Sequence, residues 1–176
     1  MLKSGGIILY PTDTVWGIGC DATNQEAVAK IFKLKQRAEA KSLIVLVAND
    51  GMLQNHVAEV PELAWDIINL AVSPTTIIYP KGKNLAKNVL AENGSIAIRL
   101  IKDEFCSQLL QKFRKPIVST SANISGEITP FNFKSIANAI KNGVDYVVDA
   151  QYDKGTHQPS ALLKLGLTGE IEVLRK

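Results

Sequence analysis

The sequence predicts a single domain of the α/β class. Short segments of β-branched and aliphatic residues alternate with segments of helical periodicity, which is typical of that class. The chain has 176 residues, of which 46% are hydrophobic, so one domain can bury a sizeable core. There is no internal repeat, low-complexity tract or linker, and we therefore expect residues 1–176 to form one domain.

Eight strands are expected from the runs of aliphatic and aromatic residues. The first run ends at Pro11, which has no backbone N–H and therefore ends regular strand pairing. The expected strands are Ile7–Tyr10, Leu43–Val47, Thr76–Tyr79, Ser95–Leu100, Pro116–Ser119, Tyr146–Asp149, Ala161–Leu165 and Ile171–Leu174.

Four helices are expected between these strands. The clearest covers Asn24–Lys35, where Asn24 suits the N-cap and Ala27, Val28, Ile31 and Leu34 form one apolar face. A second has Pro61 in its first turn and carries Leu63, Ile67 and Leu70. The remaining two are Asp103–Phe113 and Lys134–Lys141, the latter ending near Asn142 and Gly143.

Composition argues against several classes of protein. The net charge of +3 permits a nucleotide or RNA partner without indicating a dedicated nucleic-acid binder. The two cysteines, Cys20 and Cys106, have no metal-site spacing and are expected to be buried thiols in a reducing compartment. The sequence contains no signal peptide and no run of about 20 apolar residues, so we expect a cytoplasmic protein. Neither a P-loop nor a GxGxxG motif occurs.

The segment from Tyr10 to Cys20, YPTDTVWGIGC, carries the strongest functional signal. Three short polar side chains follow the first strand, and Gly17 and Gly19 then permit unusual backbone angles or close approach. Lys35, Arg37 and Lys41 follow within seven positions. Hydroxyls at a strand end together with clustered cations suit a small polar substrate held beside a polyphosphate. A tight turn beside a solvated helix end is the structural alternative.

Three segments resemble the YrdC/Sua5 family: PTDTVWGIGCDA, the K-x-R of Lys35 and Arg37, and STSANISG at 119–126. They occur in the family's order, and the likeness runs from about Gly5 to Leu165. The resemblance implies a twisted mixed β-sheet flanked by helices, in the family's short form without a C-terminal Sua5-type extension. It also implies synthesis of threonylcarbamoyl-AMP and pyrophosphate from L-threonine, bicarbonate and ATP, for threonylcarbamoyladenosine in tRNA.

The same resemblance assigns roles to particular residues. It makes Lys35 and Arg37 catalytic, and gives ATP binding to Arg37, Lys41, Ser119, Thr129 and Ser160. It gives threonine binding to Thr14, Arg99, Ser121 and Asp149, with Thr76 and Asn123 in support. From the residues alone, Arg99 could instead form a surface salt bridge with Asp103 or Glu104, and the 119–126 segment could be a purely structural turn.

The sequence departs from the family pattern at two positions near these residues. Ser42 stands where the family usually has proline, and Leu46 stands where it often has a histidine near threonine. Leucine cannot form a hydrogen bond, so that contact is expected to be absent or replaced.

The resemblance also sets expectations for cofactors and partners. ATP is a substrate, Mg²⁺ is expected to be bound through the ATP phosphates, and no metal site on the protein is expected. Downstream tRNA-modification enzymes and weak binding to tRNA or double-stranded RNA are further expected partners, with no membrane association. Two alternatives stay open: an RNA-binding module of the same fold without catalysis, and a carbamoyl-transfer domain.

Overall fold

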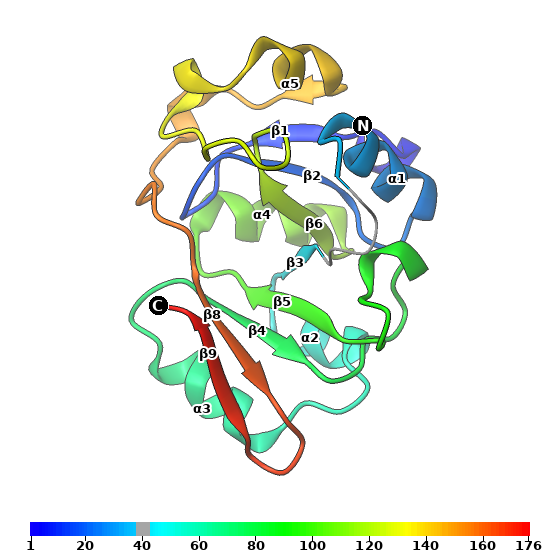
Figure 1. Ribbon diagram of the computed structural model, residues 1–176, viewed down its shortest axis with the longest axis vertical. Helices are drawn as coiled ribbons and strands as arrows, with labels where there is room; N and C mark the ends of the chain where they lie inside the picture. Colours follow the sequence, from blue (N-terminus) through cyan, green and yellow to red (C-terminus); the bar gives the residue numbers. More distant parts are fainter. Residues whose placement is uncertain (38–42) are drawn as a thin grey trace.

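The computed structural model describes residues 1–37 and 43–176. The described residues form one nine-stranded mixed sheet with the strand order β7-β1-β2-β6-β3-β5-β4-β8-β9 (Figure 1). Three pairs are parallel, namely β1 with β7, β3 with β5 and β4 with β8, and the other five are antiparallel. The strands are β1 Ile8–Tyr10, β2 Gly17–Asp21, β3 Ile44–Val47, β4 Thr75–Tyr79, β5 Ile96–Leu100, β6 Ile117–Ser121, β7 Tyr146–Val147, β8 Ala161–Leu165 and β9 Ile171–Arg175. A mixed sheet within an α/β domain confirms the predicted fold class.

Five α-helices are present in the described residues: α1 Gln25–Leu34, α2 Asp50–His56, α3 Glu62–Leu70, α4 Glu104–Phe113 and α5 Asn138–Gly143. The predicted N-cap of α1 is confirmed, because the Asn24 side chain accepts hydrogen bonds from the backbone N–H groups of Glu26 and Ala27. Asp103 caps α4 in the same way by accepting from the Cys106 N–H.

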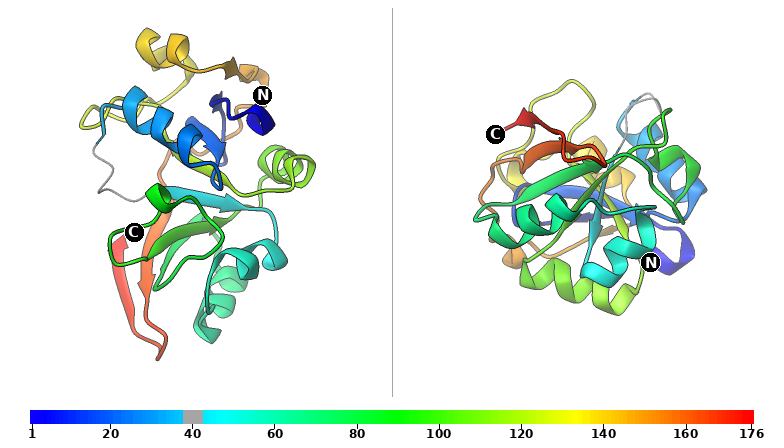
Figure 2. Two further views of the ribbon diagram at one scale, coloured as in Figure 1. Left: turned by 90° about the vertical axis from the view of Figure 1, so that its right-hand side faces the viewer. Right: turned by 90° about the horizontal axis from the view of Figure 1, so that it is seen from below.

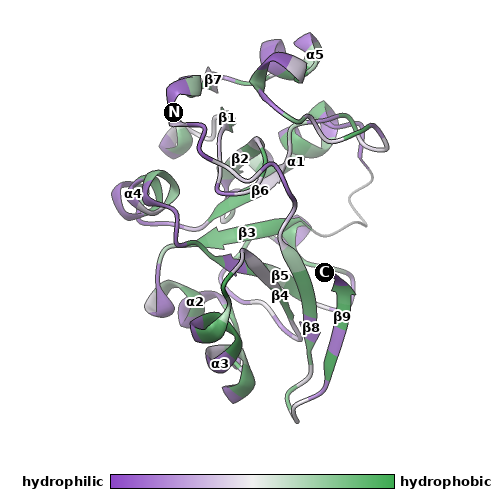
Figure 3. Ribbon diagram, turned by 90° about the vertical axis from the view of Figure 1, so that its left-hand side faces the viewer, coloured by the Kyte–Doolittle hydropathy of each residue, from purple (hydrophilic) through white to green (hydrophobic). Residues whose placement is uncertain are grey.

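Two hydrophobic clusters hold the layers together. The larger one joins α1, α2 and α3 to alternate residues of the central strands, including Val45 and Val47 of β3 and Ile96 and Ile98 of β5. The smaller one lies under α4 and contains Tyr10 and Leu46. Figure 3 shows β3 as hydrophobic along its length, as expected for a strand at the middle of a sheet that is covered on both faces. Both cysteines are buried, as predicted.

The observed elements differ from the predicted ones in a few places. Strand β2 was not predicted, because its sequence GIGCD has two glycines and little β propensity. Helix α2 was not predicted either, because its seven residues are too few to show a periodic pattern. The expected helix Lys134–Lys141 is a 3₁₀ turn at Phe133–Ser135 followed by α5, and Pro61 is the N-cap of α3 rather than part of its first turn.

Close approach, not backbone strain, explains the glycines of β2. A Cβ on Gly19 would lie 2.7 Å from Cε1 of Tyr10 and 2.8 Å from the carbonyl oxygen of Val118. The Tyr10 ring therefore packs directly on the β2 backbone, and only glycine fits there. This packing fixes the end of β1 against β2, whose other edge pairs with β6, and the candidate site is built from the ends of these strands.

The two ends of the sheet carry different elements. The β8–β9 hairpin projects at one end and α5 lies at the opposite end, as Figures 1 and 2 both show. The 12–17 loop, the end of β6 and the start of β8 meet between these ends and surround a cavity. None of the helices in the described part of the chain is long and apolar enough to cross a membrane.

Candidate active site

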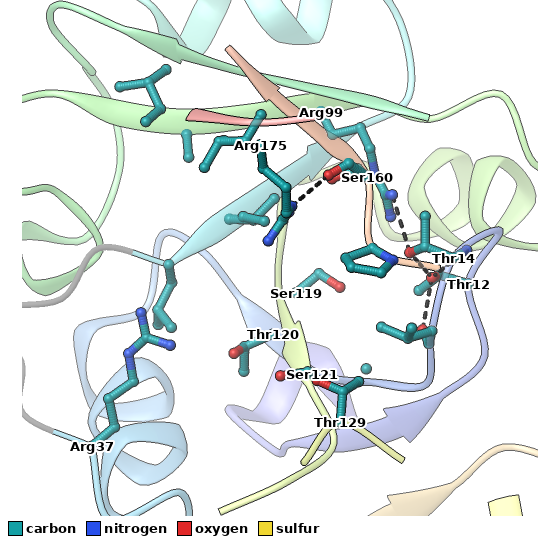
Figure 4. Close-up of a pocket in the computed structure, with 18 residues that line it drawn as sticks. Thr12, Thr14, Arg37, Arg99, Ser119, Thr120, Ser121, Thr129, Ser160 and Arg175 are labelled. Atoms are coloured by element: carbon teal, nitrogen blue, oxygen red, sulfur yellow. Dashed lines mark hydrogen bonds between the residues drawn. The ribbon is translucent and has the colours of Figure 1, made fainter. Parts of the chain in front are cut away.

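The cavity has a volume of about 330 Å³ and is lined by 18 described residues (Figure 4). Its floor is apolar and consists of residues from β3, β4, β5 and β8: Ile44, Ile78, Ala97 and Leu162. Its polar groups are hydroxyls and guanidiniums, from Thr12, Thr14, Arg37, Arg99, Ser119, Thr120, Ser121, Thr129, Ser160 and Arg175. Among the described residues, the lining includes three arginines and no carboxylate side chain. An apolar floor with a few convergent polar groups is the usual form of a small-molecule site.

A directed chain of hydrogen bonds fixes one end of the cavity. Arg99 Nη1 donates to the Thr14 hydroxyl over 3.1 Å, and the Thr14 and Thr12 hydroxyls are 2.9 Å apart. The Thr12 hydroxyl donates to the carbonyl of Val15 over 2.8 Å, so the hydrogen between the two hydroxyls comes from Thr14. This sequence of donors holds both threonine side chains in one orientation.

Asp13 sits behind Arg99 and holds its guanidinium. Arg99 Nη2 lies 3.1 Å from Asp13 Oδ1, and the arginine side chain is only 5% exposed. Burial raises the pKa of Asp13, and the guanidinium of Arg99 partly offsets that rise. The Arg99 Nε–H is buried and has no acceptor in residues 1–37 and 43–176, so this arginine still has a donor to offer a ligand. The predicted alternative of a surface salt bridge with Asp103 or Glu104 is wrong.

Arg37 and Arg175 provide the other cations. Figure 4 shows Arg37 on the side of the cavity away from Thr12 and Thr14, with Arg175 entering from β9. Arg175 Nε donates to the Ser160 carbonyl over 2.8 Å, and the Ser160 hydroxyl lies 2.7 Å from that of Thr76. Burial lowers the pKa of both arginines, with Arg99 adding repulsion at Arg175. Partly dehydrated cations that converge on one cavity favour an anionic ligand.

The end of β6 supplies three consecutive hydroxyls. Ser119, Thr120 and Ser121 all line the cavity, and the strand is paired with β2 on one side and β3 on the other. Gly17 lies opposite Ser121, and a Cβ at that glycine would come within 3.0 Å of the Ser119 hydroxyl oxygen. The glycine therefore leaves room for the Ser119 hydroxyl.

The segment 153–159 crosses the 12–14 loop and holds it in place. The backbone N–H groups of Thr156 and His157 donate to the carbonyls of Asp13 and Thr14, over 3.0 and 2.7 Å. Trp16 Nε1 donates to the Asp153 carboxylate over 2.7 Å. We call this segment the strap, because it ties the cavity's threonine pair to the start of β8.

Gly155 should be needed for the strap to pack. An added Cβ would lie 2.5 Å from the Thr12 carbonyl oxygen and 2.8 Å from that of Thr14, and both are backbone atoms that cannot rotate away. We expect Gly155→Ala to lower the free energy of unfolding by about 1–3 kcal/mol, as other overpacking substitutions do. Urea unfolding would measure it, with Gly51→Ala as control, since Gly51 is exposed in α2 and an added Cβ would meet nothing nearer than 3.5 Å. Equal midpoints for the two variants would contradict this packing argument.

Seven of the residues predicted for the site line this cavity: Thr14, Arg37, Arg99, Ser119, Ser121, Thr129 and Ser160. Four do not. Lys35, Thr76 and Asn123 are buried beside it, and Asp149 is exposed, where its side chain caps a 3₁₀ turn by accepting from Gln151 N. Lys41 and Ser42 lie outside the described residues. Leu46 packs in the cluster under α4 and pairs with Arg99 across β3 and β5, but it is not among the lining residues.

Sequence reasoning did not select Thr12, Thr120 or Arg175. For Arg175 a signal existed: it ends an apolar β segment, as Arg99 does, and Arg99 was selected. Nothing in the sequence shows that β9 returns to the site, because that depends on the β4–β8–β9 pairing. No cluster of three or more His, Cys, Asp or Glu side chains that could hold a metal ion occurs in residues 1–37 and 43–176.

The fold and cavity together define an α/β protein with a cationic, hydroxyl-lined site for a small anionic ligand. The chain belongs to the Sua5/YciO/YrdC family, whose model, described as "Telomere recombination", matches residues 1–176. It is 35% identical over 173 residues to the threonylcarbamoyl-AMP synthase of Pseudoalteromonas translucida, covering 97% of this chain and 91% of that protein.

Two solved structures of Sua5 from P. abyssi share the fold. A variant of that protein matches with a TM-score of 0.89 at 26% identity, over 99% of this chain and 53% of the other. The Sua5 structure complexed with L-threonine matches with a TM-score of 0.85 at 26% identity, over 93% of this chain and 48% of the other. This chain thus spans about half the length of the Sua5 chains that it matches.

Proposed function

We propose that this protein is a threonylcarbamoyl-AMP synthase, which forms threonylcarbamoyl-AMP and pyrophosphate from L-threonine, bicarbonate and ATP. The observation that carries the proposal is the cavity, whose described lining has three arginines and no carboxylate, with a fixed arginine–threonine group at one end. Two relatives support the proposal: the P. translucida protein is named a threonylcarbamoyl-AMP synthase, and Sua5 has been solved in complex with L-threonine.

L-Threonine is assigned to the end held by Arg99. The buried Nε–H of that arginine needs an acceptor, and an amino-acid carboxylate provides one in a planar geometry that suits a guanidinium. The Thr14 and Ser121 hydroxyls lie in the same lining and would orient the substrate's polar groups. Asp149 is not assigned to L-threonine binding, because its side chain is exposed and caps its own 3₁₀ turn.

ATP is assigned to the part of the cavity around Arg37 and Arg175. Two guanidiniums can follow phosphate charge as it moves to the leaving pyrophosphate, and Ser119, Thr129 and Ser160 add hydroxyl donors. Because the described lining has no carboxylate, we infer that Mg²⁺ enters with the ATP phosphates as part of the substrate. Lys41, which lies outside the described residues, remains a predicted ATP-binding residue.

The chemistry needs positioning and charge stabilisation more than covalent catalysis. The threonine amine gives a carbamate either with carbon dioxide, releasing a proton, or with bicarbonate, releasing water. A carbamate oxygen then attacks the α-phosphorus. The bond to the β-phosphate oxygen breaks, and pyrophosphate leaves with its electron pair. A site in which arginines and hydroxyls converge can hold the two substrates in line, and that placement supplies much of the rate.

Further parts of the proposal concern where the product goes. Threonylcarbamoyl-AMP is an activated intermediate, so an enzyme that transfers its acyl group to adenosine in tRNA would act next. We accordingly propose a cytoplasmic site of action, and weak contact with tRNA.

The experiment that tests the function is pyrophosphate release from Mg-ATP and bicarbonate, with and without L-threonine. We expect release that depends on threonine, is weaker with serine, and is accompanied by threonylcarbamoyl-AMP in mass spectra. Release that is equal with and without threonine would contradict the proposal. Binding of RNA with a steep salt dependence and no release would instead favour the RNA-binding alternative. Release that requires carbamoyl phosphate would favour the carbamoyl-transfer alternative.

A further inference from the structure

Lys35 is a buried cation that faces a protein loop and is absent from the cavity lining. It follows the last residue of α1, its side chain is only 1% exposed, and Arg37, two positions later, does line the cavity. The K-x-R pair thus separates in space, with one residue facing the site and the other facing the turn that follows β6.

All three donors of the Lys35 ammonium have acceptors in that turn. Nζ donates to the carbonyl of Ser121, to the carbonyl of Asn123 over 2.6 Å and to Asn123 Oδ1 over 3.5 Å. In return, the Ser125 N–H donates to the Lys35 carbonyl over 2.8 Å. An ammonium group has three N–H donors, so reaching a phosphate would break at least one of these bonds. A buried carbonyl left without its donor costs about 1–3 kcal/mol.

Asn123 extends this connection toward the cavity. Its Nδ2 donates to the carbonyls of Ile124, over 3.1 Å, and Glu127, over 2.7 Å. The β6 ladder ends at Ser121, and the Ala122 N–H still donates to the Trp16 carbonyl over 3.0 Å. Beyond Ala122, Lys35 and Asn123 provide the side-chain hydrogen bonds that hold the turn. Ser121 at one end of this turn and Thr129 just past the other both line the cavity.

We propose that Lys35 is a positioning residue, which clamps the 121–127 turn and so places the Ser121 and Thr129 hydroxyls, rather than a ligand of the ATP phosphates. The proposal rests on the proposed function of the same site. Burial, with repulsion from Arg37, lowers the pKa of Lys35 to about 8.

The clamp and the phosphate-ligand role predict different binding defects for Lys35→Met, which keeps the chain length and removes the donors. As a clamp, Lys35 holds the Ser121 end of the turn directly and the Glu127 end through Asn123. Kd for L-threonine measured without nucleotide should therefore rise about 5–20-fold, and Kd for adenosine and for ATP should rise together. As a phosphate ligand, it would affect ATP alone. Isothermal titration of L-threonine, adenosine and ATP separates the two. Unchanged threonine binding with weakened ATP binding would overturn the proposal.

Matched variants complete the design. Lys33→Met removes an exposed cation from the same helix and should leave all three affinities unchanged. Asn123→Ala removes the other half of the clamp and should reproduce the Lys35→Met pattern, and the double variant should be little worse than either single one. If Lys35→Met does not fold, Asn123→Ala gives the same test, and threonine binding unchanged by it would overturn the clamp.

A measurement without ligands keeps the two proposals apart. Amide hydrogen exchange in the peptide covering 119–130 should accelerate at least tenfold in Lys35→Met and stay unchanged in Lys33→Met. Exchange in that peptide that is equal in the two variants would contradict the clamp itself. Wild-type protein that binds neither L-threonine nor ATP, with the exchange difference intact, would contradict the proposed function and leave the clamp standing.

Discussion

Arg37→Ala should lower kcat/KM for ATP by a factor on the order of 10²–10³ while leaving the fold intact. Arg37 lines the cavity, and its guanidinium is the cation of the K-x-R pair that can reach a triphosphate. Removing one group that stabilises transition-state charge typically costs this much, because the interaction strengthens as pyrophosphate leaves. Threonine-dependent pyrophosphate release at varied ATP would measure it, with Kd for L-threonine unchanged.

Two further variants serve as an intermediate case and a control for the Arg37→Ala measurement. Arg37→Lys keeps a charge and loses the planar fork, so it should fall between wild type and Arg37→Ala. Lys33→Ala removes an exposed cation from helix α1 and should retain full activity, which would exclude a general effect of net charge. Full activity in Arg37→Ala would contradict the assignment of ATP to this part of the cavity.

The sequence was sufficient to predict the elements whose signals are local. The apolar face of α1 and its Asn24 cap, the end of β1 at Pro11, and the β8–β9 segments are all found where they were expected. Strand β2 was not predicted from the sequence, because its stability comes from pairing with β1 and β6 and not from its own residues. A strand of this kind is visible only once its neighbours are placed.

The same distinction applies to the site. Thr14, Arg99 and Ser119 belong to segments with recognisable residues, and the structure brings them to one cavity. The direction in which a side chain points was not predictable, and Lys35 illustrates this. It lies two positions from Arg37, but it is the C-cap of α1, with its Nζ against the 121–127 turn. Spacing in sequence could not show which of the two cations would face the ligand.

Arg99→Ala should have the second large effect, because it removes two functions at once. The buried guanidinium holds the Asp13 carboxylate and the Thr14 hydroxyl, and it has a free Nε–H for the substrate. We expect kcat/KM for L-threonine to fall about 10²–10³-fold, as for the loss of a charge-assisted pair of hydrogen bonds. Stability should fall by roughly 1–3 kcal/mol, a value below that of a fully buried pair because Asp13 is 22% exposed.

The stability loss in Arg99→Ala should depend on pH in a defined direction. Burial already raises the pKa of Asp13, and without the guanidinium that pKa rises further. A carboxyl whose pKa is higher in the folded state than in the unfolded state costs stability as pH rises through that range. The difference from wild type in urea unfolding should therefore be larger near pH 7 than near pH 4.

Adding Asp13→Asn should recover much of that stability without restoring threonine turnover, because the neutral amide needs no counter-charge and the substrate still lacks its guanidinium. Recovery of turnover in the double variant would mean that Arg99 serves only to neutralise Asp13, and the threonine carboxylate would have to bind elsewhere.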